Sequence, residues 1–314
     1  MRVLLWHVHG SWTTAFVQGA HDYLLPVTPA RGPDGRGRAE TWEWPPSAVE
    51  VTREEARDVE VDVVIVQRPV ELERLARQWL GDRRVPTIYL EHNAPQGRIA
   101  DMRHPAADRD NVDLVVHVTH FNDLFWDCGS TPNWVIEHGI VDPGYRYSGE
   151  TERAAVVINE APRRARVTGT DLLARFADKG VPIDLFGMKA GDVTAPVQAI
   201  DDLPQERLHD ELARRRVYLH PIRWTSLGLS LIEAMQLGMP VVALATTEAP
   251  DAIPAGAGVV STCVERLTDA ARGFLAEPER AREAGLTARR SALERFGLER
   301  FLADWDRALA EVAR

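Results

Sequence analysis

Short apolar runs alternate with amphipathic stretches along the first half of the chain. Continuous apolar runs, typical of strands buried on both faces, occupy residues 3–6, 61–66, 85–92, 112–119 and 133–140. Apolar positions with helical spacing predict a helix over 71–80, and a short helix is predicted within 121–128. Residues 17–60 contain the turn-forming segments RGPDGRGR and WEWPPS and are predicted to be irregular. Strands that alternate with helices predict a parallel sheet covered on both faces.

The second half repeats this alternation after a polar, turn-rich segment at 142–153, where we place a linker. Strands are predicted at 154–159, 182–187, 217–222 and 241–244. Helices are predicted at 170–180, 203–216, 228–237, 264–275, 277–287 and 298–313. The expected fold class is therefore α/β, with two Rossmann-like doubly wound domains facing a cleft. We expect an N-terminal domain at 1–145, a C-terminal domain at 146–295, and a final helix at 296–314 that packs back towards the first domain.

Composition and charge narrow the possible functions. A formal charge of −10 over 314 residues argues against a nucleic-acid-binding surface, which needs many cations facing phosphates. All but two of the 37 basic residues are arginine, so an arginine cluster is weak evidence for an anion site. The two cysteines form neither a disulfide framework nor a metal motif. Neither a signal peptide nor a stretch of about 18 apolar residues is evident, so we expect a cytoplasmic protein, with peripheral attachment to a membrane left open.

The stretch TSLGLSLIEAMQLGMPVVAL (225–244) carries the most specific chemistry. A helix that starts near Gly228 would direct its first N–H groups, aided by the Thr225 and Ser226 hydroxyls, at an anion. Glu233, about one and a half turns later, could then hold the hydroxyls of a ribose. The alternative is that Thr225 or Ser226 merely caps the helix and that Glu233 is a solvated surface residue.

This stretch resembles the donor site of the GT-B glycosyltransferases related to glycogen synthase and bacterial mannosyltransferases, the retaining family 4. Their pattern E-x-F-G-L, three residues, then E-A-M-x-x-G-x-P-V-V-A is matched here from Gly228 to Ala243. The resemblance implies a ribose-binding role for Glu233 and a diphosphate-binding role for the segment Ser226, Leu227, Gly228 and Leu229. Thr225 stands where the family has its first Glu, which contacts the transferred sugar.

Two further segments of the second half resemble the same family. The run 156–173 is similar to a pattern that carries an Arg and a Lys and ends in G-x-D-x-L, here Gly169, Asp171 and Leu172. This implies that diphosphate-neutralising cations come from Arg163, Arg164 and Arg166, with Arg163 favoured and Thr168 at the position of the Lys. The segment IDLFGMKAG implies that Gly187 and Lys189 line the nucleotide site.

The first half offers a weaker set of candidates. The segment HVHGSW lies where the family has a glycine loop that faces the donor phosphates, which implies roles for Gly10 and Ser11. VPTIYLEHNAP resembles the strand that ends in a His beside the transferred sugar, so His92 is the catalytic candidate; the alternative is a hydrogen-bonded loop residue. No metal site is expected, because His7 and His9 lack a carboxylate partner at a fixed spacing.

The resemblance implies a hexosyltransferase-type enzyme (EC 2.4) that uses a nucleoside-diphosphate sugar, retains the anomeric configuration and needs neither metal nor other cofactor. The acceptor, whether a glycan, a lipid or a small molecule, is left open, as are the donor base, the sugar and the oligomeric state. Two alternatives remain. One is a related GT-B enzyme with another reaction, such as sugar-nucleotide epimerisation or phosphorolysis. The other is a non-catalytic sugar-nucleotide-binding scaffold, which Thr225 and the missing Lys would favour.

Overall fold

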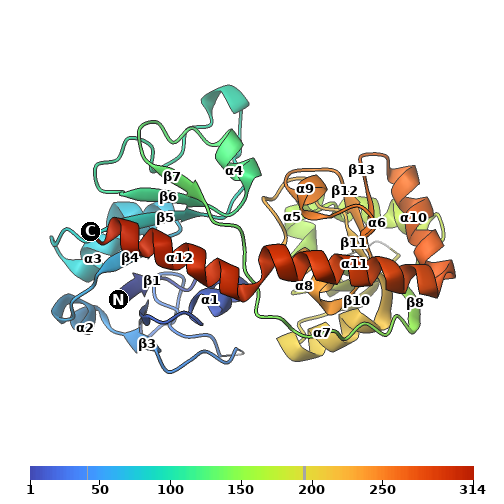
Figure 1. The fold of residues 1–314 in the computed structure, drawn as a ribbon, viewed down its shortest axis with the longest axis horizontal. Coiled ribbons are helices and arrows are strands. Elements are labelled where there is room, and N and C mark those ends of the chain that lie inside the picture. Colours follow the sequence, from blue (N-terminus) through green and yellow to red (C-terminus); the bar gives the residue numbers. More distant parts are fainter. Residues whose placement is uncertain (41, 194–195) are drawn as a thin grey trace. The chain divides into compact units, whose positions relative to one another are not determined.

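A computed structural model describes residues 1–40, 42–193 and 196–314. The chain divides into two compact units (Figure 1). The first combines residues 1–141 with 298–314, and the second comprises residues 142–297. Each unit is an α/β structure built on its own parallel sheet. The prediction of two doubly wound α/β halves is confirmed.

The first unit contains a seven-stranded parallel sheet in the order β3-β2-β1-β4-β5-β6-β7. Its strands are β1 (Arg2–Leu5), β2 (Asp22–Pro26), β3 (Ala48–Val51), β4 (Val63–Val66), β5 (Thr87–Glu91), β6 (Leu114–His117) and β7 (Asn133–Val135). Its helices are α1 (Gly10–Phe16), α2 (Arg53–Asp58), a π-helix η1 (Glu71–Leu75), α3 (Ala76–Leu80), a 3-10 turn η2 (Ile99–Asp101), α4 (His120–Phe125) and α12 (Leu298–Val312). Every residue of β4, β5 and β6 is buried, as expected for central parallel strands.

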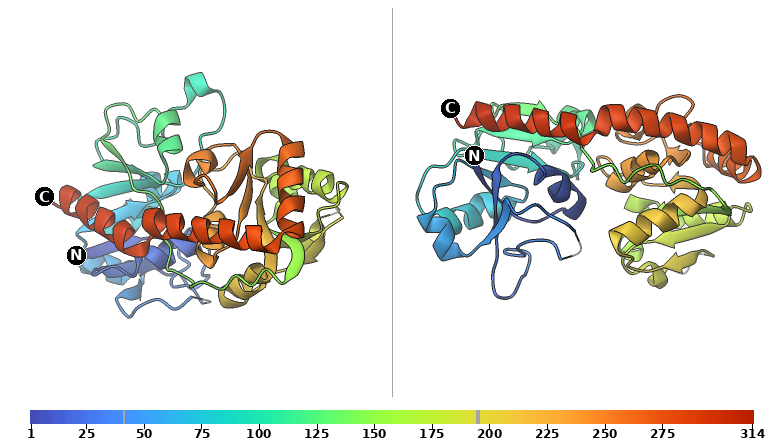
Figure 2. Two further views of the ribbon diagram at one scale, coloured as in Figure 1. Left: turned by 45° about the vertical axis from the view of Figure 1, so that its right-hand side comes forward. Right: turned by 60° about the horizontal axis from the view of Figure 1, so that its bottom comes forward.

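The chain returns to the first unit through α12. This helix packs on α1 (Figure 2). The contact is aromatic: the Trp12 and Phe16 rings lie 5.5 Å and 5.0 Å from the Trp305 ring. All three side chains are almost fully buried. Such rings contribute large apolar areas to a core, so α12 is an integral part of the first unit.

The second unit has a six-stranded parallel sheet in the order β10-β9-β8-β11-β12-β13. Its strands are β8 (Thr151–Val157), β9 (Ile183–Phe186), β10 (Gln198–Ile200), β11 (Arg215–His220), β12 (Val241–Leu244) and β13 (Gly258–Ser261). Its helices are α5 (Ala161–Thr168), α6 (Thr170–Ala177), a 3-10 turn η3 (Ala190–Asp192), α7 (Gln205–Arg214), α8 (Leu229–Leu237), α9 (Ala249–Ala252), α10 (Val264–Ala276) and α11 (Pro278–Phe296). Helix α11 runs along α8.

The structure corrects two expectations. Residues 17–60 are not irregular throughout, because they contain β2, β3 and α2. The turn-forming segments lie between these short elements, and Thr52 starts α2 with a capping box to Glu55. The predicted helix at 71–80 begins as a π-helix before it becomes α-helical.

The strand orders place a topological switch point in each sheet. In the first unit it lies between β1 and β4, and in the second between β8 and β11. The connections leave these neighbouring strands towards opposite sides, which opens a crevice at their carboxyl ends, the usual ligand position in such sheets. The loops after β1 and β4, and after β8 and β11, are therefore the places to examine for function.

Candidate functional site

The loop after β11 leads into the first turn of α8 in the second unit. Gly228 is the N-cap residue in extended backbone, and no side chain caps the helix, which removes the capping alternative for Thr225 and Ser226. A Cβ atom at Gly228 would lie only 2.8 Å from Cε1 of the buried His220, so a side chain here would require the His220 ring to shift. Ser226 and Leu227 are buried, whereas Thr225, Gly228 and Leu229 are half-buried. The first turn of α8 thus lies beyond the carboxyl end of β11, and N–H groups in the first turn of a helix lack partners within the helix.

Glu233 is buried rather than solvated, with 4% of its surface exposed. Its carboxylate accepts a hydrogen bond of 3.1 Å from the side-chain amide of Gln205 on α7. The Nε2 atom of His209, one turn further along α7, lies 3.8 Å from the other carboxylate oxygen. The surface-residue alternative is therefore wrong. A buried carboxylate held by an amide donor is suited to accept hydrogen bonds from a diol.

Residues after β8 form α5, which contains the three candidate arginines. Its N-cap, Glu160, adopts the left-handed backbone conformation. The Glu160 carboxylate accepts hydrogen bonds of 2.9 Å and 2.6 Å from Arg163 and forms an ion pair of 3.2 Å with Lys189. Arg163 and Lys189, two predicted site residues from different loops, thus both contact the Glu160 carboxylate. The pKa of Glu160 is lowered by its hydrogen bonds to Arg163 and then to Lys189.

Arg164 and Arg166 differ in their surroundings. Arg166 forms a 3.1 Å ion pair with Asp171, which is also held by Arg223. Arg164 is half-buried and, within the described part of the chain, has no salt bridge. Burial, followed by the neighbouring charge of Arg163, lowers the pKa of Arg164. A partly desolvated cation near the switch point is stabilised by an incoming anion, so Arg164 is a better phosphate candidate than Arg166.

Close backbone contacts join the α5–α6 turn to the loop that follows β11. Gly169, between α5 and α6, has a positive φ of 73°, and a Cβ atom there would lie 1.9 Å from the carbonyl oxygen of Pro221. The Arg223 and Trp224 N–H groups donate to the carbonyl of Val167 at 2.9 Å and 3.2 Å. The arginine helix and the loop before α8 are thus fixed to each other. Gly187, directly after β9, also lies close to backbone, because a Cβ atom there would lie 2.6 Å from the carbonyl oxygen of Ile158.

The first unit presents a histidine cluster at its own switch point. His92 directly follows β5, and its ring centroid lies 4.1 Å from His9 and 6.2 Å from His138. Its Nε2 atom lies 3.0 Å from Oε1 of Gln67, the residue that follows β4. Burial lowers the pKa of His92 well below its usual value, and the His9 and His138 rings lower it further. His92 is therefore a neutral imidazole near pH 7.

Gly10 and Ser11 start α1, one residue after the His9 N-cap. They are half-buried and lie on the same loop as the histidine cluster. The structure thus brings Gly10, Ser11 and His92 together at one end of the first sheet. In the second unit it brings Arg163, Arg164, Gly187, Lys189 and the 225–233 segment to the carboxyl ends of β8, β9 and β11. Arg166 instead joins the Asp171–Arg223 pair.

Sequence reasoning missed Gln67, Gln205, His209 and His220. Gln67, His209 and His220 are buried, and Gln205 is half-buried. Gln67 and His220 lie at strand ends, and Gln205 and His209 share one face of α7 at a spacing of four residues. A polar residue at the carboxyl end of an apolar strand is the signal that could have identified the first two.

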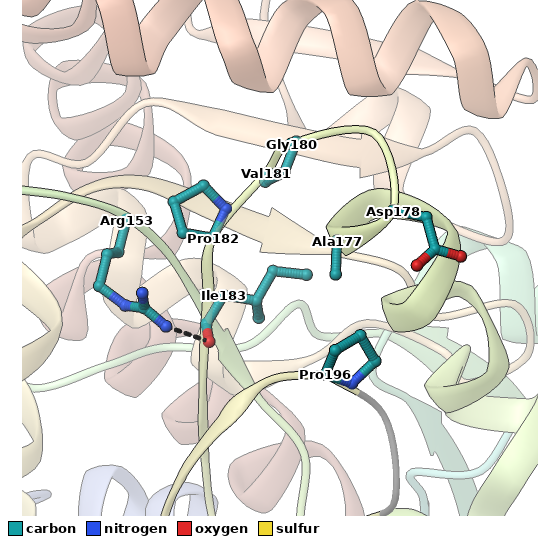
Figure 3. A pocket seen from close by; sticks show the side chains of 8 residues that line it. All are labelled: Arg153, Ala177, Asp178, Gly180, Val181, Pro182, Ile183 and Pro196. Atoms are coloured by element: carbon teal, nitrogen blue, oxygen red, sulfur yellow. Dashed lines mark hydrogen bonds between the residues drawn. The ribbon is translucent and has the colours of Figure 1, made fainter.

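A pocket of about 370 Å³ in the second unit lies away from this site (Figure 3). Most of its lining residues lie between the end of α6 and the start of β9, among them Asp178 and Pro182, and Arg153 and Pro196 complete it. Arg153 donates a hydrogen bond of 2.8 Å to the Ile183 carbonyl at its edge. The pocket thus lies at the amino end of β9, opposite the end that bears the candidate site.

Part of the second unit matches the model of a known protein family. Residues 189–291 match the model of the family described as glycosyl transferases group 1. This segment contains Lys189, Gln205, and the whole stretch from β11 to β12. No curated protein matches the sequence significantly.

Solved structures resemble the chain over nearly its full length. Sucrose-phosphate synthase from Thermosynechococcus elongatus is 13% identical, with a TM-score of 0.73 over 99% of this chain and 98% of that one. HepE from Anabaena, in complex with UDP-glucose, is 13% identical, with a TM-score of 0.71 over 99% and 100%. A glycosyltransferase from Rickettsia africae is 14% identical, with a TM-score of 0.70 over 100% and 98%.

The chain has the GT-B fold. The resemblance to GT-B glycosyltransferases that the 225–244 stretch indicated is thereby confirmed. Within the described residues of this GT-B protein, no group of three or more His, Cys, Asp or Glu side chains is arranged to hold a metal ion. No described helix has the length and apolar character needed to cross a membrane.

Proposed function

We propose that this GT-B protein is a glycosyltransferase that moves a hexose from a nucleoside-diphosphate sugar to an acceptor hydroxyl. The observation that carries the proposal is the convergence at one switch point of the α8 N-terminus, the buried Glu233 carboxylate and the half-buried Arg164. The family match covers the α8 and Glu233 parts of this arrangement. An anion site beside a diol-binding carboxylate is suited to a nucleoside diphosphate.

The chemical task of such a site is to stabilise the departing diphosphate. The C1–O bond to the phosphate breaks, and the acceptor oxygen forms the new bond to C1. Negative charge then grows on the leaving phosphate. N–H groups at the start of α8 and the guanidinium groups of Arg163 and Arg164 are suited to stabilise that charge. These groups support a reaction that does not require a metal ion.

We further propose retention at the anomeric carbon. The acceptor hydroxyl attacks from the face that the diphosphate leaves, and its proton passes to the departing phosphate oxygen. We assign the orientation of the transferred sugar to His92. The neutral state of its imidazole supports hydrogen bonding to a sugar hydroxyl rather than pairing with a charge.

Calorimetric titration with UDP, GDP and ADP tests nucleotide binding first. HepE was solved with UDP-glucose, so UDP-glucose is the first donor to assay, followed by GDP-mannose. Release of free nucleotide together with a new glycoside, whose anomeric configuration is read by NMR, supports the proposal. Absence of binding by all three nucleotides would overturn the donor-site assignment.

Thr225 favours a second candidate, a non-catalytic sugar-nucleotide-binding protein. It stands where the resembling family has a carboxylate that contacts the sugar. Nucleotide binding without turnover of any donor would support this reading, and a Thr225→Glu variant that gains turnover would support it further. A donor whose sugar is altered but not transferred would instead indicate an epimerase.

A further inference from the structure

Gln67 lies between two segments of the first unit and contacts both. It directly follows β4, at the switch point between β1 and β4. Only 2% of its surface is exposed. Its side-chain Nε2 atom donates a hydrogen bond of 2.8 Å to the backbone carbonyl of Trp6. Its Oε1 atom lies 3.0 Å from Nε2 of His92.

These two contacts determine how the amide is oriented. A backbone carbonyl can only accept a hydrogen bond, so the NH₂ group of Gln67 must face Trp6. The amide oxygen then faces His92. Since an amide oxygen can only accept, Nε2 of His92 must carry the proton. The hydrogen bonds of Gln67 thus determine which nitrogen of the His92 ring carries the proton.

Gln67 is itself held in place. Its backbone N–H donates a hydrogen bond of 2.5 Å to the Glu71 carboxylate at the start of the π-helix η1. Glu71 is fully buried, and its other oxygen accepts a 2.6 Å hydrogen bond from Arg68. Rotation of Gln67 away from His92 would also break its bond to Trp6. The amide is therefore fixed at both its backbone and its side chain.

We propose that Gln67 is a positioning residue that holds His92 as the neutral Nε2–H tautomer, so that Nδ1 acts only as a hydrogen-bond acceptor. This deepens the proposed function and rests on it in one respect, namely that His92 orients the transferred sugar.

The tautomer can be measured without any substrate. We suggest long-range proton–nitrogen NMR correlation on the whole protein with ¹⁵N-labelled histidine near pH 7, with the His92 signals assigned from a His92→Gln sample. The expected result is a protonated Nε2 and an unprotonated Nδ1. A proton on Nδ1, rapid exchange between the tautomers, or a charged imidazolium would each overturn the proposal.

Substitution of Gln67 tests the cause. Gln67→Leu removes the acceptor, so His92 is expected to become a mixture of tautomers, whereas Gln67→Glu keeps an acceptor and the Nε2 proton. Gln78→Leu, which alters a half-buried glutamine on α3, is the control and should leave the His92 signals unchanged. An unaltered Nε2–H tautomer in Gln67→Leu would overturn the assignment. If Gln67→Leu does not fold, the tautomer of His92 measured in the wild-type protein still tests the proposal.

Activity provides an independent measurement. Gln67→Leu is expected to lower kcat for glycosyl transfer roughly tenfold, as one lost hydrogen bond implies, with the affinity for UDP unchanged. In a His92→Leu background the same change should have no further effect, because Gln67 acts through His92. Additive losses would contradict this coupling. If the tautomer is as expected but no donor is turned over, the proposed function fails while the tautomer assignment stands.

Discussion

Gln205 donates a hydrogen bond of 3.1 Å to the buried carboxylate of Glu233, and its amide nitrogen lies 2.9 Å from Nε2 of His209. The amide NH₂ group can serve both, because it has two hydrogens and His209 Nε2 then acts as the acceptor. Helix α7 thereby orients the carboxylate that we assign to the ribose.

Removal of the Glu233 carboxylate should weaken nucleotide binding. We expect Glu233→Ala to raise the Kd for UDP about tenfold or more, since hydrogen bonds to charged groups contribute about 1.5–3 kcal/mol. Calorimetric titration provides the measurement. Glu206→Gln, which alters an exposed carboxylate on α7 next to Gln205, is the control and should bind UDP normally. Unchanged affinity in Glu233→Ala would exclude the ribose assignment.

The three arginines of α5 should contribute unequally to diphosphate binding. Arg164→Ala and Arg163→Ala should each weaken UDP binding, and the loss should shrink as salt concentration rises because the attraction is electrostatic. Arg166→Ala is the matched comparison and should have little effect, since Arg166 pairs with Asp171. Titrations of UDP at two salt concentrations would measure these differences. A larger loss in Arg166→Ala than in Arg164→Ala would reverse the assignment.

Close packing at Gly169 should make this position intolerant of a side chain. Gly169→Ala combines a left-handed backbone penalty of about 1–2 kcal/mol with a clash against the Pro221 carbonyl. Gly180→Ala is the matched control, because Gly180 has a φ of 82° but no atom within 4 Å of the added Cβ. Thermal unfolding should show the larger loss for Gly169→Ala, and UDP affinity should fall in that variant alone. Equal effects on stability would show that the packing contributes nothing.

Buried histidines should make the first unit lose stability in acid. Burial lowers the pKa of His117 and of His138 to about 3 in each case, and lowers that of His92 too. The folded state therefore binds fewer protons than the unfolded state between about pH 6.5 and pH 3. The stabilisation is fully present above pH 6.5 and is lost as pH falls, by up to about 1.4 kcal/mol per pH unit for each histidine.

Hydrogen exchange of the β4 and β5 amides at pH 7, 6 and 5 would measure this loss. His138→Gln should reduce the dependence of stability on pH by about one proton. His120→Gln, which alters an exposed histidine on α4, should not reduce it. The same pH dependence in wild type and His138→Gln would show that His138 is not a source of the effect.

Much of the proposed donor site could be predicted from the sequence, because α8 and Glu233 lie within one short stretch of the chain. Helix α8 runs from Leu229 to Leu237, close to the expected 228–237, since Gly238 and Pro240 end the helical pattern within a few residues. Glu233 lies within the same short motif. The apolar central strands were likewise recognisable because residues buried on both faces form continuous apolar runs.

Other features depend on contacts between distant residues. Gln67 contacts His92 across 25 positions, and Gln205 contacts Glu233 across 28. A short sequence motif cannot show that two residues so far apart in the chain are in contact. Strands β2 and β3 were missed for a related reason, because they pair only with each other and with β1, and each is only four or five residues long. Their register is set by the assembled sheet.

The discontinuous first unit has a consequence for the order of folding. During synthesis the ribosome delivers residues 1–141 long before α12, which supplies Trp305 and Phe301 to the core around Trp12. The second unit is contiguous in sequence and can complete its core as soon as residue 297 has emerged. Domains usually fold in order from the N-terminus. In this chain, residues 1–141 are synthesised first, but their aromatic core stays exposed until α12 has been made. The first unit therefore completes its folding after the second.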